Sequence, residues 1–332
     1  ITCVDRATGD VLDEAAPATV LDVTLAAGDD VVCTIENVRT GAITVVKKTV
    51  GGDATFGFTS TTLSPSSFDI TTSGGTGERL FDDLFPDTYD VTETALAGWD
   101  LTSATCSDGS DPASIALAAG ETVTCTFTNT RQTGSIELKK AWSGTAGQTT
   151  LNIGTIVDGA DVASVLTGPG GTDPLTTGTQ GVDTGTYYVS ESGGLAEHDS
   201  TLACTRDGQA FTPGTDGAVA VGADEVIVCT FTNTRQTGTI TVVKDFVGTA
   251  GLVDLLVDGN IEATDQGDGG STGAIPVDTG TRTASETAGT GTDLAAYSST
   301  YSCTEDSNAA SPIDGSGTTT GDMPVEAGDA WT

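Results

Sequence analysis

The chain has little of what most enzymes and nucleic-acid-binding proteins use. Its 332 residues include one histidine, and no GxSxG, HExxH or phosphate-loop motif is present, which makes turnover catalysis remote. With 47 acidic and only 12 basic residues, the formal net charge is −35, so the chain repels nucleic acid and anionic membrane surfaces. It also lacks an 18-residue apolar run, so we expect no direct membrane insertion of this segment.

Metal ligands are equally scarce, and the sequence predicts no cofactor and no metal centre. There is no CxxC motif, and we expect the single histidine, His198, to be a solvated loop residue. Two acidic runs, 107–111 and 265–270, resemble fragments of a calcium loop without its full ligand spacing. Ordinary turn formation is the favoured interpretation of both runs, with weak Ca²⁺ binding as the alternative.

Sustained helical periodicity is absent as well. Short alternating runs rich in Thr and Val are separated by Gly-Asp, Asp-Gly, Pro-Ser and Gly-Gly turn signals. We therefore predict an all-β fold, built as a tandem array of small Ig-like or prealbumin-like β-sandwich modules of about 100 residues each. Segment 51–77 is the longest stretch expected to be irregular.

A Thr-Gly pair that opens an alternating run ending in lysine recurs three times and marks the start of each predicted module. Its glycines, at positions 41, 134 and 238, are 93 and 104 residues apart. The predicted parts are the C-terminal part of a truncated module (1–39), two complete modules (40–131 and 132–235) and a module lacking its last strand (236–332). Residue 1 corresponds to residue 301 in this repeat, so we expect the parent polypeptide to continue after Thr332 with a cysteine and, four residues later, an asparagine.

Each Thr-Gly pair is followed six residues later by one of the chain's five lysines: Lys47, Lys140 or Lys244. Lys47 shares the parity of Ile43 and Val45, so the alternation of a strand points its amine into the core. A lone buried ammonium costs several kcal/mol unless it is paired, neutralised or chemically consumed. The neighbouring lysines Lys48 and Lys139 have the opposite parity and are expected to face solvent.

Asparagine and glutamate are the candidate partners of the buried lysines. Three of the six asparagines lie four residues after a cysteine, and Glu93 and Glu191 face inward in Tyr-x-Val-x-Glu runs whose spacing Glu286 repeats. The complete sets are Lys47, Glu93 and Asn129 in one module and Lys140, Glu191 and Asn233 in the next. The incomplete sets hold Asn37 at one end of the chain, and Lys244 with Glu286 at the other.

The seven cysteines fall into one pair for each unit, with one left over. The predicted disulfides are Cys3–Cys33, Cys106–Cys125 and Cys204–Cys229, while Cys303 has no partner. Such pairs are typical of an oxidising compartment. By the chain-entropy estimate, each closed loop contributes about 3 kcal/mol.

The runs TGxITVVK, YxVTET, AGWDLT and CTFTNT resemble tandem SpaA-like, prealbumin-fold (Cna B-type) modules. The resemblance spans about the whole chain and is sharpest over 41–131, whereas Arg282 and Ala284 replace the Tyr and Val of the motif in the last unit. Members of that family form stalks and shafts of bacterial surface adhesins and pili. The resemblance therefore implies an extracellular, prokaryotic structural fibre whose partners are neighbouring modules or copies of the same protein.

The resemblance also implies an intramolecular isopeptide bond between a first-strand Lys and a last-strand Asn, assisted by an acidic residue. It maps onto Lys47, Asn129 and Glu93, and onto Lys140, Asn233 and Glu191. Burial favours a neutral amine beside a protonated carboxyl, which suits that reaction. The alternatives left open are a simple Lys-Glu ion pair at each site and, for the whole chain, an adhesin that binds a ligand through its module loops.

Overall fold

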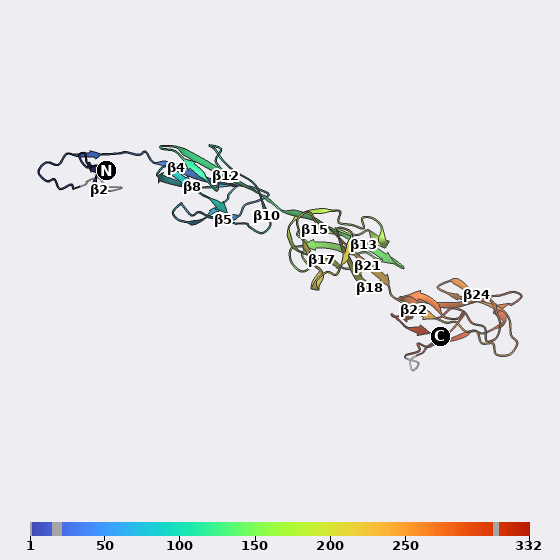
Figure 1. The fold of residues 1–332 in the computed structure, drawn as a ribbon. Coiled ribbons are helices and arrows are strands. Elements are labelled where there is room, and N and C mark those ends of the chain that lie inside the picture. Colours follow the sequence, from blue (N-terminus) through green and yellow to red (C-terminus); the bar gives the residue numbers. More distant parts are fainter. Residues whose placement is uncertain (1, 15–21, 308–311) are drawn as a thin grey trace. The chain divides into compact units, whose positions relative to one another are not determined.

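A computed structural model of the chain describes residues 2–14, 22–307 and 312–332. The predicted parts 1–39 and 236–332 are therefore described only in part. Strands dominate (Figure 1), and in the described residues the helices are single 3-10 turns: η1 (Pro169–Gly171), η2 (Thr215–Gly217) and η3 (Leu294–Ala296). Within these ranges we find no helix that is both long and apolar enough to cross a bilayer. The predicted all-β fold class is confirmed.

The chain forms two compact units, Ile1–Gln132 and Thr133–Thr332. The first unit begins with a small sheet of order β2-β1-β3, built from β1 (Thr2–Asp5), β2 (Val11–Glu14) and β3 (Val31–Thr34). The finer division into four parts stays a prediction.

Beyond this small sheet, the first unit contains what we call the first module. One of its sheets has the order β10-β12-β4-β7, from β4 (Gly41–Val50), β7 (Thr76–Leu84), β10 (Trp99–Cys106) and β12 (Thr122–Arg131). Its other strands form sheets of order β6-β5-β9 and β11-β8, from β5 (Thr55–Thr59), β6 (Ser67–Thr71), β8 (Asp87–Tyr89), β9 (Thr92–Glu93) and β11 (Ile115–Leu117).

The second unit opens with the second module, which has two larger sheets. The first has the order β16-β13-β21-β18-β19, from β13 (Thr133–Ser143), β16 (Gln180–Asp183), β18 (His198–Arg206), β19 (Gln209–Phe211) and β21 (Val226–Arg235). The second has the order β15-β14-β17-β20, from β14 (Thr150–Gly154), β15 (Ala163–Leu166), β17 (Gly185–Ser192) and β20 (Ala218–Val221).

The rest of the second unit, which we call the third module, is assembled from shorter strands. Its three-stranded sheets have the orders β25-β22-β31 and β24-β23-β27, from β22 (Thr237–Ile240), β23 (Val253–Val257), β24 (Asn260–Gln266), β25 (Ile275–Asp278), β27 (Ala284–Ala288) and β31 (Ala330–Trp331). Two-stranded sheets pair β26 (Gly280–Arg282) with β30 (Met323–Val325) and β28 (Thr300–Cys303) with β29 (Ile313–Ser316).

Two sequence expectations about strands are wrong. Segment 51–77 is not irregular, because it contains β5, β6 and the start of β7. The first strand of the third module was expected to run from Gly238 to Lys244, but β22 ends at Ile240. Its parallel partner β31 pairs only with Thr239 and Ile240, and beyond them Val243 forms an isolated antiparallel bridge with Ser271.

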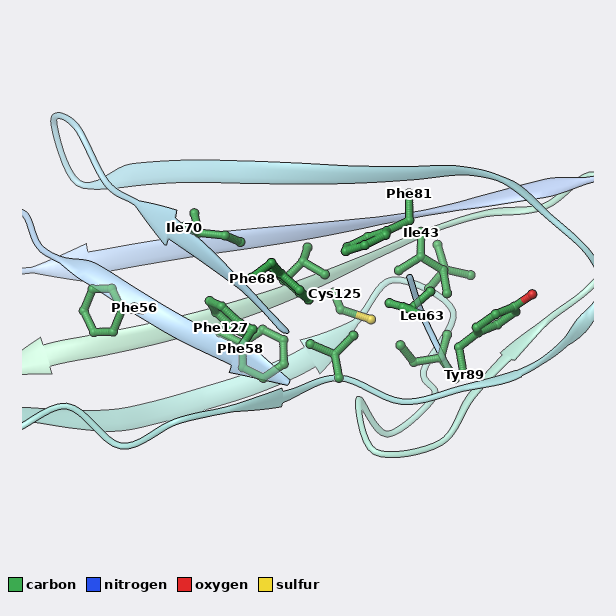
Figure 2. Packing of buried hydrophobic residues seen from close by; sticks show 14 of the residues in the cluster. Ile43, Phe56, Phe58, Leu63, Phe68, Ile70, Phe81, Tyr89, Cys125 and Phe127 are labelled. Carbon is green, nitrogen blue, oxygen red and sulfur yellow. The ribbon is translucent and has the colours of Figure 1, made fainter. Parts of the chain in front are cut away.

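Each module has its own apolar core, to which side chains from its different sheets contribute. In the first module, Ile43 and Val45 of β4 pack with Phe56 and Phe58 of β5 and with Phe127 of β12, all of them buried (Figure 2). The Phe58 and Phe127 rings meet edge to face with their centroids 5.2 Å apart. Separate clusters fill the second and third modules.

The glycine of the recurring Thr-Gly pair is required by a close backbone approach. A Cβ on Gly41 would lie 2.6 Å from the carbonyl oxygen of Glu121, and a Cβ on Gly134 would lie 2.5 Å from that of Gly222. In both modules the loop that leads into the last strand crosses the start of the first strand. A side chain at this position would push the two strands apart.

We predict that Gly41→Ala lowers the free energy of unfolding of the first module by about 1–3 kcal/mol, because the added methyl overpacks a rigid backbone contact. Gly181→Ala is the matched control, since a Cβ there would meet no atom within 4 Å. Calorimetry of the full chain, with hydrogen exchange to assign each change to its module, measures both variants. Equal stability of the two variants would contradict the close-approach explanation.

Candidate functional site

The first and last strands of each complete module are parallel neighbours, which brings together residues from opposite ends of the module. In the first module β4 pairs with β12 so that Lys47 lies opposite Phe127 and Thr49 opposite Asn129. In the second, β13 pairs with β21 in the same register, with Lys140 opposite Phe231. The predicted parity is confirmed for both lysines and both asparagines, all four of which are buried. Lys48 and Lys139 are exposed, as expected.

In the first module the three predicted side chains form a closed set of contacts. The Lys47 amine donates to Glu93 Oε2 at 3.0 Å, to the Phe127 carbonyl oxygen at 3.4 Å and to Asn129 Oδ1. Asn129 Nδ2 donates to Glu93 Oε1 at 2.6 Å. The Lys47 and Glu93 side chains are 0% and 2% exposed, so water is excluded from the set. Each of Lys47, Glu93 and Asn129 therefore contacts the other two.

Burial is the main electrostatic influence on the lysines of the two sites. Desolvation lowers the pKa of Lys47, and the hydrogen bond and charge of Glu93 oppose it without reversing the direction. The same causes lower the pKa of Lys140, with Glu191 as the opposing partner. An aromatic ring adds a further contact at each site, because the amine lies 4.2 Å from the Phe56 ring centroid in one module and 4.3 Å from that of Trp142 in the other.

This arrangement in the first module suits an amide exchange. A neutral amine is a nucleophile, and its nitrogen lies beside the carboxamide of Asn129. The Glu93 carboxyl contacts both the nitrogen that would attack and the nitrogen that would leave. One carboxyl group can therefore receive a proton from the first and deliver a proton to the second.

The second module keeps the same residues but not the closed set. The Lys140 amine and Glu191 Oε2 lie 3.0 Å apart. Glu191 Oε1 accepts a hydrogen bond from the Ser200 hydroxyl instead of from the asparagine. Asn233 is fully buried, yet neither of its side-chain polar atoms has a hydrogen-bond partner among the described residues. An unsatisfied buried amide is costly, so this site is assembled less completely than the first.

Among the described residues, the incomplete set of the third module brings Lys244 and Glu286 together without an asparagine contact, whereas the inward orientation expected for Asn37 is wrong. Lys244 pairs with Glu286 at 2.6 Å, with side chains 16% and 10% exposed, and its amine lies 4.4 Å from the Phe246 ring centroid. Ser299 donates to the other oxygen of Glu286 at 2.7 Å. Asn37 is exposed and follows the end of β3.

Sequence analysis missed the aromatic rings and the serine hydroxyls at these sites. Trp142 and Phe246 could have been found, because each follows its lysine by two residues and so has the same strand parity. Phe56 could not, since it comes from the segment expected to be irregular. Ser200 and Ser299 each precede a cysteine by four residues, which is a weak signal in a chain rich in Ser and Thr.

The cysteines form the three pairs named from the sequence: Cys3–Cys33, Cys106–Cys125 and Cys204–Cys229. In both complete modules the paired cysteines lie directly opposite each other on neighbouring antiparallel strands. Cys303 is a buried free thiol, and burial, with the charge of Asp314, raises its pKa.

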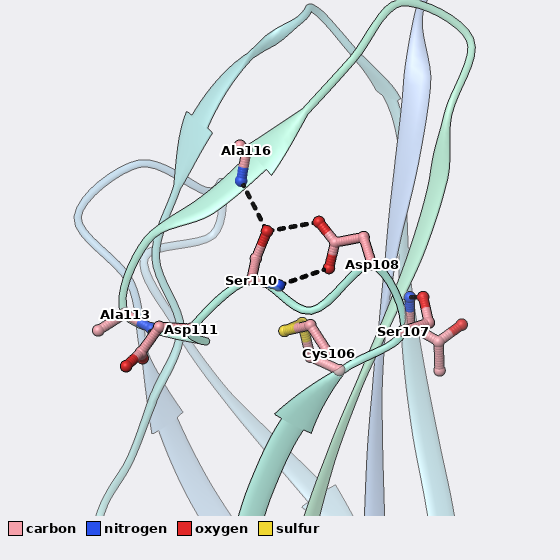
Figure 3. Close-up of a disulfide and its surroundings, with 9 residues drawn as sticks. Cys106, Ser107, Asp108, Ser110, Asp111, Ala113 and Ala116 are labelled. Atoms are coloured by element: carbon pink, nitrogen blue, oxygen red, sulfur yellow. Dashed lines mark hydrogen bonds between the residues drawn. A yellow bond between two sulfur atoms is a disulfide. The ribbon is translucent and has the colours of Figure 1, made fainter.

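Aspartates of both acidic runs accept hydrogen bonds, in the first run from its own loop and in the second from another loop. Beside the Cys106 disulfide, Asp108 accepts hydrogen bonds from the backbone nitrogen (3.1 Å) and the hydroxyl of Ser110 (Figure 3). Asp265 accepts from the Thr290 backbone nitrogen at 2.6 Å. Within the part of the chain that the structure describes, no group of three or more His, Cys, Asp or Glu side chains is placed to hold a metal ion. Weak Ca²⁺ binding stays a prediction.

His198 is not the solvated loop residue that the sequence suggested. It begins β18 and is half-buried, with its ring centroid 5.0 Å from that of Trp142. Its Nε2 lies 3.0 Å from the carbonyl oxygen of Thr145. Packing against Trp142 explains its position.

We predict that Lys47 makes stability depend on pH in a variant that cannot cross-link. In Asn129→Ala the folded protein holds the Lys47 proton more weakly than the unfolded chain, so unfolding takes up a proton between the lowered pKa and the ordinary value of 10.5. The free energy of unfolding of the first module therefore rises with pH across that window and falls as the pH is lowered through the folded pKa.

Denaturant unfolding at several pH values tests this prediction. The control is the double variant Asn129→Ala/Lys47→Met, which replaces the amine with an unbranched apolar chain and should lose that part of the slope. Identical slopes in the two variants would show that burial does not lower the pKa of Lys47.

Comparison with known proteins identifies the domains. A family model described as a prealbumin-like fold domain matches residues 43–131, and a second model with the same description matches residues 1–39, 135–235 and 260–332. No curated protein sequence is close enough to the chain to count as a match.

Solved structures of several bacterial proteins show a distant likeness. The Bacillus anthracis TIE protein is 16% identical with a TM-score of 0.41, and the match covers 78% of this chain and 48% of that one, so this chain spans about half its length. The major pilin from Streptococcus pyogenes is 15% identical with a TM-score of 0.37, covering 60% of this chain and 99% of that one. A variant of BcpA, the major pilin subunit of Bacillus cereus, is 13% identical with a TM-score of 0.30, covering 87% and 95%. Because the two family models together match most of the chain, it belongs to the family of prealbumin-like fold domains, which it carries in tandem.

Proposed function

We propose that this chain is part of an extracellular structural fibre, such as a pilus or surface stalk of a prokaryote, whose complete modules lock themselves covalently. The locks are amide bonds between Lys47 and Asn129 and between Lys140 and Asn233, assisted by Glu93 and Glu191. The observation that carries the proposal is the closed, water-free set of contacts among Lys47, Glu93 and Asn129. The reacting residues belong to the module that they cross-link. Each bond therefore forms once, and the chain is not an enzyme in the turnover sense.

In the proposed reaction the neutral Lys47 nitrogen attacks the side-chain carbonyl carbon of Asn129. A bond forms between that nitrogen and the carbon, and the bond from the carbon to Nδ2 breaks. Glu93 takes a proton from the attacking nitrogen and delivers a proton to Nδ2, so that ammonia leaves and the carboxyl group ends in its starting state. No oxidant, metal or cofactor is required for this balance.

The position of the bond suits a load-bearing role. Lys47 and Asn129 are 82 residues apart in sequence but lie on neighbouring parallel strands, one at each end of the module's chain. Tension that enters through β4 and leaves through β12 would otherwise act on the hydrogen bonds between these two strands. With the amide bond in place, the force passes from strand to strand without unfolding the residues between them.

The short connections between modules and the disulfides support the same load-bearing role. A single residue, Gln132, separates β12 from β13, and Gln236 alone separates β21 from β22, so little slack lies between successive first and last strands. The disulfides are typical of an oxidising compartment, which fits a location outside the cell. In this proposal the partners of each module are its neighbours in the chain and further copies in a fibre.

Intact mass spectrometry tests the cross-links directly. We expect the measured mass of the reduced full chain to be lower than the mass calculated from its sequence by two molecules of ammonia. Peptide mapping should place one loss in each complete module. Lys47→Ala or Glu93→Ala should abolish the loss in the first module and lower its resistance to heat and protease, because a loop spanning nearly the whole module is no longer closed.

Lys48→Ala is the matched control, because this exposed neighbour lies on the same strand but faces away from the site. It should keep the ammonia loss unchanged. An unshifted mass for the first module of the unmodified chain would leave only an ion pair at this site and would refute the covalent lock.

A further inference from the structure

The two complete modules differ in what occupies the second oxygen of the assisting carboxylate. In the first module Glu93 Oε1 accepts from Asn129 Nδ2 at 2.6 Å. In the second, Glu191 Oε1 accepts from the Ser200 hydroxyl, and the side-chain amide of Asn233 has no hydrogen-bond partner. The serine therefore takes the place on the carboxylate that the asparagine holds in the first module.

The backbone register explains why, of the two complete modules, only the second has this hydroxyl. Ser200 of β18 lies directly opposite Asn233 of β21, so their side chains share one face of the sheet. The residue opposite Asn129 is Leu101 of β10, at a register shift in the ladder, and its side chain has no group that could bind a carboxylate. Leu101 is 50% exposed and leaves Glu93 to the asparagine.

The third module repeats the serine contact independently. Ser299 donates to Glu286 Oε1 at 2.7 Å while Lys244 holds Oε2 at 2.6 Å. Among the described residues of this module no asparagine contacts Glu286, yet the carboxylate adopts the same division of its oxygens between an amine and a hydroxyl. A serine at this position thus provides a stable partner for the carboxylate when the asparagine is not bound to it.

We infer that the residue opposite the last-strand asparagine sets the rate at which each module forms its lock, and that Ser200 is a positioning residue that holds Glu191 away from Asn233. This inference rests on the proposed function. For the second module to react, the bond from Ser200 to Glu191 must break and Oε1 must turn to Asn233 Nδ2. The atoms exchanged are otherwise those of the first module: a bond forms between Lys140 Nζ and the Asn233 carbonyl carbon, and ammonia leaves.

The consequence is an order of locking within one chain. A hydrogen bond to a charged group is among the stronger ones in proteins, so replacing it before reaction slows the second module by about tenfold relative to the first. The first module locks early after folding, and the second remains an ion pair for longer.

A time course of refolding tests the inference. The full chain is collected in denaturant from inclusion bodies, before it has folded and locked, then refolded in a thiol–disulfide buffer and quenched in acid at intervals, and the ammonia loss of each module is followed by peptide mass mapping. Glu93→Ala and Glu191→Ala chains provide unlocked starting material for calibration of the two modules. Circular dichroism of every variant verifies that its strands have formed.

Three substitutions test the role of the hydroxyl, and they are expected to change the rate of ammonia loss in different directions. Ser200→Ala should speed the second module by about tenfold, whereas Ser200→Thr, which keeps the hydroxyl, should leave it slow. Leu101→Ser should slow the first module to a similar extent. Because the hydroxyl and not the side-chain volume controls the outcome, a merely structural role of Ser200 would not give this pattern.

The outcomes separate the inference from the proposal beneath it. Loss of ammonia from both modules at equal rates, or a rate in the second module that Ser200→Ala leaves unchanged or lowers, overturns the role of Ser200 while the covalent lock stands. If neither module of the unmodified chain loses ammonia, the covalent lock itself is refuted, and the inference is refuted with it.

Discussion

The parallel pairing of first and last strands is the constraint on which both candidate sites depend. Because β4 lies beside β12, and β13 beside β21, residues from the two ends of a module share one ladder and one inward face. The two asparagines are in the same register relative to their lysines, so the placement follows from the backbone and not from the side chains. Pairing between strands so far apart in sequence forms late in folding and costs much chain entropy. A covalent bond between the same strands would reduce the chain entropy that the module gains in every later unfolding event.

Much of this framework could be predicted from the sequence because strand alternation has a period of two residues. The burial of Lys47, Asn129 and Cys125 follows from their parity with apolar neighbours, and it is confirmed. The short strands β5 and β6 were missed although their apolar residues alternate, because stretches rich in Gly, Ser and Pro flank both of them. The contribution of Phe56 to the lysine site was lost with them, since long-range packing leaves no local pattern.

A residue that differs from the sequence motif can still preserve the local structure. The tyrosine of the Tyr-x-Val-x-Glu run donates its hydroxyl to a carbonyl four residues earlier, as Tyr89 does to Phe85 at 2.8 Å. Arg282 replaces this tyrosine, yet its Nε donates to the carbonyl oxygen of Asp278, also four residues earlier and at 2.8 Å. The guanidinium preserves this hydrogen bond in β26, the strand just before β27, which carries Glu286, so the weaker motif still delivers its glutamate to the lysine.

The energetics of the buried set explain why a module would gain from reacting. A lysine and a glutamate taken out of water lose hydration that their mutual attraction only partly restores, and Asn129 must be oriented as well. In the proposed product, the lysine nitrogen is part of a neutral amide, so no charge has to be balanced across the core. The same packing that makes the ion pair costly excludes the water that could hydrolyse the new bond. Folding would therefore create both the driving force for the cross-link and the conditions that preserve it.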